Sequence, residues 1–256
     1  MTDQPLGGER RRAAPRKRTG GWFVLTALVF ICLCALYFSP LFRLAAVDIT
    51  GRSRLSRERV MEIAGLKPGL SRFERPAADI AARLNQEPWV KTAAAVWQGN
   101  QVQVSLTERE PVGLIRYYDL YYLALDETGA ILQETTLDVE KGLPVVSGVF
   151  VTKGLRGRQL PHPGLLDGLT VLSRMAPALR AQVSEVHVDP DRSLTLYMTG
   201  GPTVLWGPVP DGKEREALTK QKLEMFGGVW LAVKKRATTC RIDMRVDGLG
   251  IPSGCQ

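Results

Sequence analysis

The chain lacks the sequence motifs of several large enzyme classes. No serine is followed by lysine three positions later, and there is no Lys-Thr-Gly, no Gly-x-Ser-x-Gly elbow and no Gly-Lys-Ser/Thr phosphate loop. The motifs of penicillin-binding acyl transferases, α/β-hydrolases and phosphate-loop NTPases are therefore missing. The sequence therefore disfavours a cell-wall enzyme.

Histidine is also scarce, with two residues in 256. His162 lies between two prolines, and His187 alternates with valines, so both are interpreted as solvated loop or strand residues. Neither has the cysteine or carboxylate cluster of a zinc site, and no cofactor is expected. Glu108 and Glu110 resemble paired catalytic carboxylates, but Arg109 between them favours a surface ion-pair role.

Charge, glycine and proline are absent from Trp22–Phe38. As a helix this run is roughly 26 Å long, close to the hydrocarbon thickness of a bilayer. The sequence predicts one transmembrane helix over residues 22–42. A cleaved signal peptide is the alternative, but its apolar region is usually about 7–15 residues long and ends at a small-x-small site. This run is longer, and Leu44-Ala45-Ala46 is a poor cleavage site.

The charge on either side of this run predicts the topology. Residues 1–21 hold six Lys/Arg and two Asp/Glu and are expected to be a disordered cytoplasmic tail, because basic flanks stay inside. This tail supplies +4 of the net charge of +8. The remaining +4 is spread over more than two hundred exported residues, which is too weak for a nucleic-acid footprint.

The four cysteines fall into two pairs. Cys32 and Cys34 lie inside the predicted span, whereas Cys240 and Cys255 lie near the exported C-terminus. In an oxidising compartment the second pair would close a loop of about 16 residues and add about 3 kcal/mol. Two unpaired thiols are the alternative, and both remain open because sequence does not give the Cα separation.

Residues 43–111 have the pattern of a small mixed domain. Val102, Val104 and Leu106 alternate strictly with polar residues, which is typical of a strand with one buried face. The periodicities predict the order β-α-α-β-β, with strands at 44–50, 90–98 and 101–108 and helices at 56–64 and about 74–86.

Residues 112–256 change to shorter elements. Two amphipathic helices are predicted at about 164–176 and 214–226. Short strands separated by turn residues predict a larger, mostly antiparallel β domain with flanking helices, with strands at 112–117, 121–125, 130–132, 183–188, 193–198, 203–206 and 239–246. The fold class predicted for the chain is α+β.

Several segments resemble the FtsQ/DivIB family of cell division proteins. The resemblance depends on four motifs: VDITG (47–51), Pro-Trp-Val-Lys-x-Ala (88–93), Leu-Thr-Glu-Arg-Glu-Pro (106–111) and Ile-Asp-Met-Arg (242–245). Residues 43–111 resemble the family's POTRA domain, and residues 112–256 resemble its β domain. Gly99-Asn100 replaces the family's usual Pro-Asn turn, which affects the turn and not the fold.

The resemblance implies a non-enzymatic, single-pass scaffold of the divisome in the bacterial inner membrane at the septum. It would bind single-pass division proteins of the FtsB/FtsL type in the periplasm and help to control septal peptidoglycan synthesis, and the POTRA domain would be a second place where division proteins bind. Neither nucleic acid nor a small-molecule substrate is implied. The family's FtsB-binding strand corresponds to Arg241, Ile242, Asp243, Met244, Arg245 and Val246.

Two alternatives remain beside this interpretation. Ile242 and Met244 would face the core if the residues after Gly250 covered the strand edge. A POTRA-bearing transport or assembly module is the other alternative. It is disfavoured because such modules are usually tandem repeats attached to a β-barrel, and no series of about ten-residue strands follows.

Overall fold

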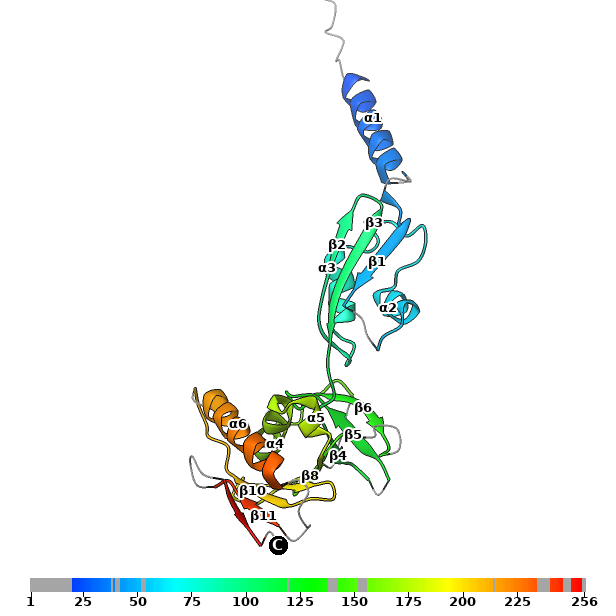
Figure 1. Cartoon of the computed structure of the whole chain (residues 1–256). Helices are drawn as coiled ribbons and strands as arrows, with labels where there is room; N and C mark the ends of the chain where they lie inside the picture. Colours follow the sequence, from blue (N-terminus) through cyan, green and yellow to red (C-terminus); the bar gives the residue numbers. More distant parts are fainter. Residues whose placement is uncertain are drawn as a thin grey trace, which may run out of the picture.

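The computed structural model describes residues 20–37, 39, 42–51, 54–118, 120–137, 142–151, 156–213, 215–233, 240–245 and 250–254. Three parts follow one another along the chain (Figure 1): helix α1, a small domain and a larger domain built on one broad sheet. The predicted tail lies outside the described residues, apart from two glycines that begin α1.

Helix α1 (Gly20–Tyr37) is 18 residues long. Its large side chains are exposed along its whole length, from Trp22 at 77% through Phe30 at 67% to Tyr37 at 44%. The Thr26 hydroxyl donates a hydrogen bond to the Trp22 carbonyl one turn earlier in the helix, at 3.0 Å. No helix among the described residues combines the length and apolar character that a membrane crossing requires.

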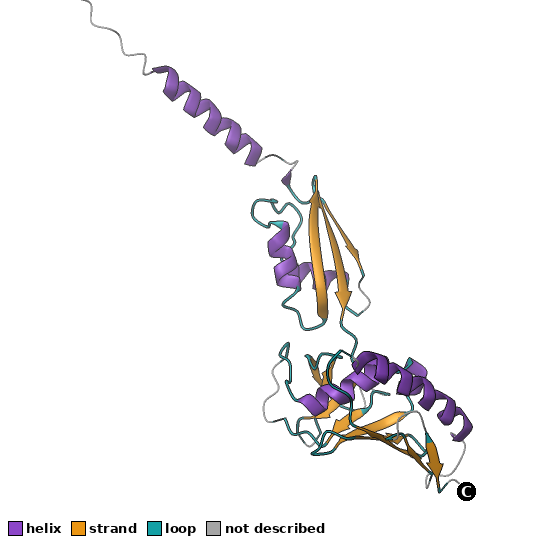
Figure 2. Ribbon diagram, turned by 90° about the vertical axis from the view of Figure 1, so that its left-hand side faces the viewer, coloured by secondary structure: helices purple, strands orange, loops and turns teal. Residues whose placement is uncertain are grey.

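The first domain has the predicted order β-α-α-β-β. Its central strand is β3, which is parallel to β1 and antiparallel to β2, and the two helices lie on one face of this sheet (Figure 2). Val102, Val104 and Leu106 are buried, as their alternation predicts. The elements are β1 (Ala46–Thr50), α2 (Arg57–Ala64), α3 (Ala77–Leu84), β2 (Val90–Gln98) and β3 (Gln101–Glu108).

Local chemistry determines where the helices of this domain begin and end. The Ser56 hydroxyl accepts the Arg59 N–H at 3.1 Å and caps α2. Helix α3 is shorter than predicted at both ends. Pro76 precedes its first residue, and Asn85 exchanges two hydrogen bonds with the Ala93 backbone of β2, at 2.8 and 3.2 Å. Side-chain pairing with the neighbouring strand therefore replaces the last helical turn.

The second domain contains a nine-stranded sheet of order β12-β11-β10-β9-β8-β7-β4-β5-β6. Five of the eight strand pairs are antiparallel, which confirms the predicted character, and three helices cover one face (Figure 2). The elements are β4 (Gly113–Arg116), β5 (Tyr122–Leu125), β6 (Ile131–Thr135), β7 (Val145–Ser147), α4 (Pro163–Arg174), α5 (Pro177–Arg180), β8 (Val183–Val188), β9 (Leu194–Met198), β10 (Thr203–Gly207), α6 (Arg215–Val233), β11 (Arg241–Asp243) and β12 (Ile251–Ser253).

Helix α6 is longer than the predicted helix, which ended near residue 226. It continues through Gly227-Gly228, although each glycine costs about 1 kcal/mol in a helix interior. Beyond them, Trp230 and Val233 are buried against the sheet, and the Trp230 ring lies 6.3 Å from that of Phe226. The free energy gained by burying these side chains offsets the low helix propensity of the two glycines.

A partly buried ion pair joins the two domains. Arg109, directly after β3, places its guanidinium 2.6 Å from the Asp126 carboxylate in the β5–β6 turn. Its Nε donates to the Val90 carbonyl at 3.2 Å. The Asp126 carboxylate also accepts the Ala130 N–H and both the N–H and the hydroxyl of Thr128. The sequence predicted a surface ion pair within Glu108-Arg109-Glu110. Arg109 instead pairs with Asp126 of the second domain, and the Glu108 carboxylate accepts the N–H groups of Arg54 and Leu55.

Apolar packing reinforces this connection. Leu132 of β6 is fully buried and belongs to the hydrophobic core of the first domain. Around it, Arg156 reaches Glu87 at 2.7 Å and donates to the Leu132 carbonyl at 3.0 Å, while Lys91 pairs with Glu127 at 2.9 Å. We call this set of contacts the interdomain joint.

Candidate partner-binding surface

Strand β11 carries three of the six residues predicted to bind a partner, Arg241, Ile242 and Asp243. It lies inside the sheet, parallel to β10 on one side and antiparallel to β12 on the other. Ile242 and Met244 are fully buried, and the Met244 N–H donates to the Leu205 carbonyl at 2.8 Å. β11 is therefore not an edge strand, and the arrangement matches the alternative in which residues after Gly250 cover it. Val246 lies outside the described residues.

Strand β12 ends the strand order of the sheet within the described part of the chain. Its three residues are exposed, and Ile251 shows 47% of its surface. Pro252 pairs with Ile242 but has no N–H to donate. Proline is tolerated at sheet edges and limits the addition of further strands there. A partner strand would find few backbone donors at this edge.

Among the described residues, no helix covers the sheet face opposite α4, α5 and α6, which we call the open face (Figure 2). The strand register places Tyr197, Thr203, Arg241 and Ser253 next to one another in a row across four strands. Arg241 is exposed, and Tyr197 shows 41% of its surface. This open face continues to β12, so a molecule bound at the edge can also contact these side chains.

One ion pair marks the end of β11. The Arg245 guanidinium approaches the Asp243 carboxylate with Nε at 3.0 Å and a terminal nitrogen at 2.6 Å. The Arg245 side chain, and then its backbone N–H, lower the pKa of Asp243 to about 2. Asp243 is therefore ionised throughout the physiological pH range and holds Arg245 in a fixed, half-exposed position.

A groove lies beside this pair. It is lined by Asp189 and Asp191 from the β8–β9 turn, Leu205 from β10, and Arg245. Asp191 accepts the N–H and the hydroxyl of Ser193, and these hydrogen bonds lower its pKa. The predicted Asp-Pro-Asp turn is present, and its two aspartates line the groove together with Arg245. Residues of both charges therefore line the groove.

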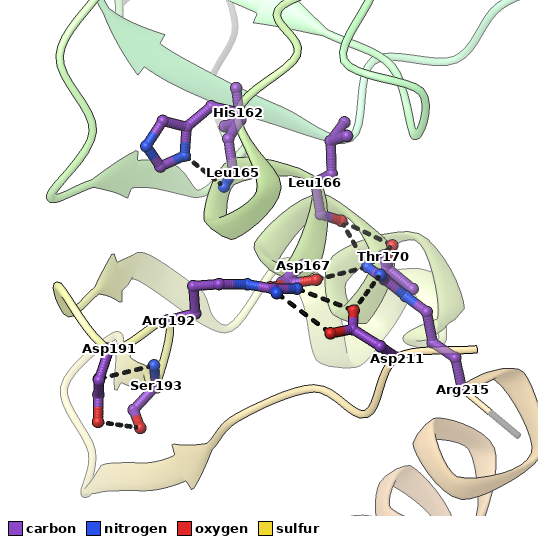
Figure 3. Close-up of polar contacts among 10 residues, drawn as sticks. All are labelled: His162, Leu165, Leu166, Asp167, Thr170, Asp191, Arg192, Ser193, Asp211 and Arg215. Atoms are coloured by element: carbon purple, nitrogen blue, oxygen red, sulfur yellow. Dashed lines mark hydrogen bonds and ion pairs between the residues drawn. The ribbon is translucent and has the colours of Figure 1, made fainter.

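A buried carboxylate stabilises the elements behind the groove (Figure 3). Asp167 of α4 has no exposed surface and contacts Arg192 at 2.8 Å and Arg215 at 2.7 Å. Asp211 accepts two hydrogen bonds from Arg192, at 3.1 and 3.2 Å. Arg192 has a left-handed backbone, with φ of 68°, and its pKa is raised by Asp211 and then Asp167. The network ties α4 to the β8–β9 turn and to the start of α6.

The histidines make local structural contacts. His162 accepts the Leu165 N–H at 3.3 Å and caps α4 (Figure 3). His187 lies 2.8 Å from the Ser147 hydroxyl, which also contacts Glu185 at 2.5 Å on the neighbouring strand. In the described part of the chain, no group of three or more His, Cys, Asp or Glu side chains is placed to hold a metal ion.

Cys240 lies at the start of β11 and is almost fully buried. Its sulfur is disulfide-bonded, whereas Cys32 and Cys34 of α1 are free thiols. Cys255 lies outside the described residues, so its pairing with Cys240 stays a prediction. The antiparallel pairing places Ser253 beside Arg241, the residue that follows Cys240.

Two family profiles match the chain. "POTRA domain, FtsQ-type" matches residues 42–109, and "Cell division protein FtsQ/DivIB, C-terminal" matches residues 114–245, more than half of the chain. A cell division protein FtsQ of Anaeromyxobacter sp. is 27% identical over 71% of this chain, and one of Myxococcus fulvus is 28% identical over 73%. These alignments span 62% and 66% of the relatives' own lengths.

Among solved structures, the extracytoplasmic domain of DivIB from Geobacillus stearothermophilus is 18% identical, with a TM-score of 0.30. The match covers 50% of this chain and 97% of that domain, and so distant a likeness carries no structural argument. The assignment depends instead on the two profiles, which follow each other in the order of the two observed domains. The chain belongs to the FtsQ/DivIB family of cell division proteins.

Proposed function

We propose that this protein is a non-enzymatic, membrane-anchored scaffold of the divisome. It binds single-pass division proteins of the FtsB/FtsL type outside the inner membrane and helps to control septal peptidoglycan synthesis. The observation that carries the proposal is the match of both folded domains, in order, to the FtsQ/DivIB profiles. The open sheet face and the β12 edge add a surface that is suited to a protein partner.

The proposed anchor is the apolar segment of residues 22–42. Two features support it: the large hydrophobic side chains of α1 are exposed, and six Lys/Arg precede the segment. With this basic tail in the cytoplasm, both domains lie in the periplasm. A disulfide at Cys240 is consistent with an oxidising compartment.

The proposed partner site is the β12 edge together with the neighbouring open face. A partner segment that adds beside β12 would be one strand away from β11, and its side chains would reach Arg241, Asp243 and Arg245 across the open face. The buried residues of the predicted set, Ile242 and Met244, would contribute by holding β11 in register. Because Pro252 removes one backbone donor, side chains must supply much of the specificity.

Site-specific photocrosslinking in dividing cells tests this proposal on the full chain. A photoreactive amino acid at Ile251 should capture a small single-pass division protein, which mass spectrometry of the crosslinked band would identify. The matched control is the same amino acid at Leu231, which is exposed at 67% on α6, on the covered side of the sheet. Capture of outer-membrane barrel proteins, or equal capture at both positions, would contradict the proposal.

A further inference from the structure

The end of the first domain nearest α1 is organised around three aromatic rings. Phe73, in the loop between α2 and α3, stacks on Tyr37 of α1 with ring centroids 5.9 Å apart. The Phe73 ring also contacts the Phe42 ring, with centroids 5.4 Å apart. The Arg72 guanidinium lies over the Phe42 ring at 5.7 Å. Residues from the helix, the connecting segment and the loop therefore meet at one point.

Backbone hydrogen bonds fix this arrangement. The Arg72 N–H donates to the Phe42 carbonyl at 2.9 Å, and the Leu44 N–H donates to the Leu70 carbonyl at 2.8 Å. On the other side, the Ala45 N–H donates to the carbonyl of Asn100 at the β2–β3 hairpin tip, also at 2.8 Å. We call residues 42–45, 67–74 and 98–101 the α1-proximal surface, which lies at the end of the domain adjoining α1 (Figure 1).

This surface combines an exposed aromatic ring with positive charge. Phe73 shows 50% of its surface although it belongs to an aromatic cluster. The charged residues of the α1-proximal surface are Arg43, Lys67 and Arg72 against Glu74, which gives three positive charges and one negative, or +2. Arg43 and Lys67 are exposed. Aromatic side chains flanked by Lys/Arg are typical of surfaces that lie in the interface of a bilayer with anionic lipids.

We infer that the α1-proximal surface docks on an anionic lipid bilayer. Phe73 enters the interface, while the neighbouring cations bind the phosphates of lipid headgroups. Continuity selects the bilayer as the occupant, because Phe73 stacks directly on the last residue of α1. The inference depends on the membrane anchor of the proposed function and adds a defined orientation of the first domain relative to the membrane.

The test uses the full chain in nanodiscs that contain about 30% phosphatidylglycerol, a composition in the range of anionic bacterial membranes. A nitroxide at Asn100→Cys, with Cys32→Ala and Cys34→Ala, reports the depth of the hairpin tip through its collision with oxygen and with a water-soluble nickel complex. The label should be shielded from nickel. In the Phe73→Ser chain, the ratio of docked to undocked molecules should fall roughly fivefold, because half a phenyl ring is no longer buried.

Phe150→Ser is the matched control, because Phe150 is 92% exposed in the second domain and its loss should leave the label unchanged. Equal nickel accessibility in the Phe73→Ser and unsubstituted chains would overturn the inference, as would equal shielding in purely zwitterionic nanodiscs. An alkaline wash of the membranes tests the anchor separately. Release of the chain by that wash refutes the proposed anchor, whereas retention with no effect of Phe73→Ser refutes the docking surface alone.

Discussion

Replacing Leu132 with alanine should destabilise the first domain, although Leu132 belongs to a strand of the second. Its side chain is fully buried and belongs to the first domain's hydrophobic core, as do Val90 and Trp89. A buried Leu→Ala change costs about 3 kcal/mol, from lost transfer free energy and the cavity that remains. With a urea m-value of about 1–2 kcal/mol/M for a domain of this size, the unfolding midpoint of the first domain should fall by about 2 M.

Hydrogen exchange read by mass spectrometry at increasing urea concentrations resolves the two domains in the full chain. Peptides from β2 and β3 should lose protection at lower urea in the Leu132→Ala chain. Two control substitutions test whether the effect depends on burial and on the domain. Leu137→Ala removes the same atoms two residues beyond β6 from a side chain that is 47% exposed, and should cost less than about 0.5 kcal/mol. Leu123→Ala, in the second domain's own core, should shift that domain first.

The result that would refute this reasoning is an unchanged midpoint for β2 and β3 peptides in the Leu132→Ala chain. In that case Leu132 would stabilise only its own domain, and the interdomain joint would consist of ion pairs alone. A lower midpoint in the first domain, with the second domain unaffected, would show that the second domain completes the core of the first.

Three further predictions concern polar and covalent contacts. Asp126→Asn should cost about 2 kcal/mol by weakening its pairing with Arg109. Burial raises the pKa of Asp126, but hydrogen bonds from Thr128 and Arg109 outweigh it and leave the pKa below its ordinary value. Its contribution is therefore complete above about pH 4 and lost as pH falls through the lower folded-state pKa, so acid titration of the variant should show a flatter loss of stability. Cys240→Ser should lower stability by about 3 kcal/mol in chemical denaturation, and peptide mapping of the unsubstituted chain should find Cys240 joined to Cys255. Asp167→Asn should weaken the attachment of α6 and cost about 2 kcal/mol, measured by thermal unfolding, because the fully buried side chain loses its charge-assisted contacts with Arg192 and Arg215, which keep Asp211 as a counter-ion.

Most of the fold could be predicted because the hydrophobic periodicity of each segment agrees with the capping and turn residues at its ends. Strand β3 alternates without interruption, and Ser56 and Gly65 mark the ends of α2 as capping rules require. Helix α6 shows where such rules fail. Its Gly227-Gly228 pair argues for a helix end, yet Trp230 beyond it reaches the sheet, and that burial is visible only once the sheet is assembled.

The interdomain joint had only a partial signal in the sequence. Arg109 between two glutamates at a domain boundary indicates an ion pair, but nothing local identifies Asp126 as its partner. The network around Asp167 had an even weaker signal in the sequence, because its two arginines, Arg192 and Arg215, lie 25 and 48 residues away. Such contacts follow from strand order, which is itself the least local property of a sheet.

The sheet edge is hidden from the sequence for a different physical reason. Strand β12 has three residues, and Pro252 at its centre argues against a strand, because proline cannot donate to a ladder. The fold tolerates it at the end of the sheet, where one missing donor costs little. The same proline makes backbone pairing with a partner weaker, and Asp243 holds Arg245 beside the edge in a fixed position. We therefore expect the recognition of a partner here to depend on the charges of the open face more than on the length of the added strand.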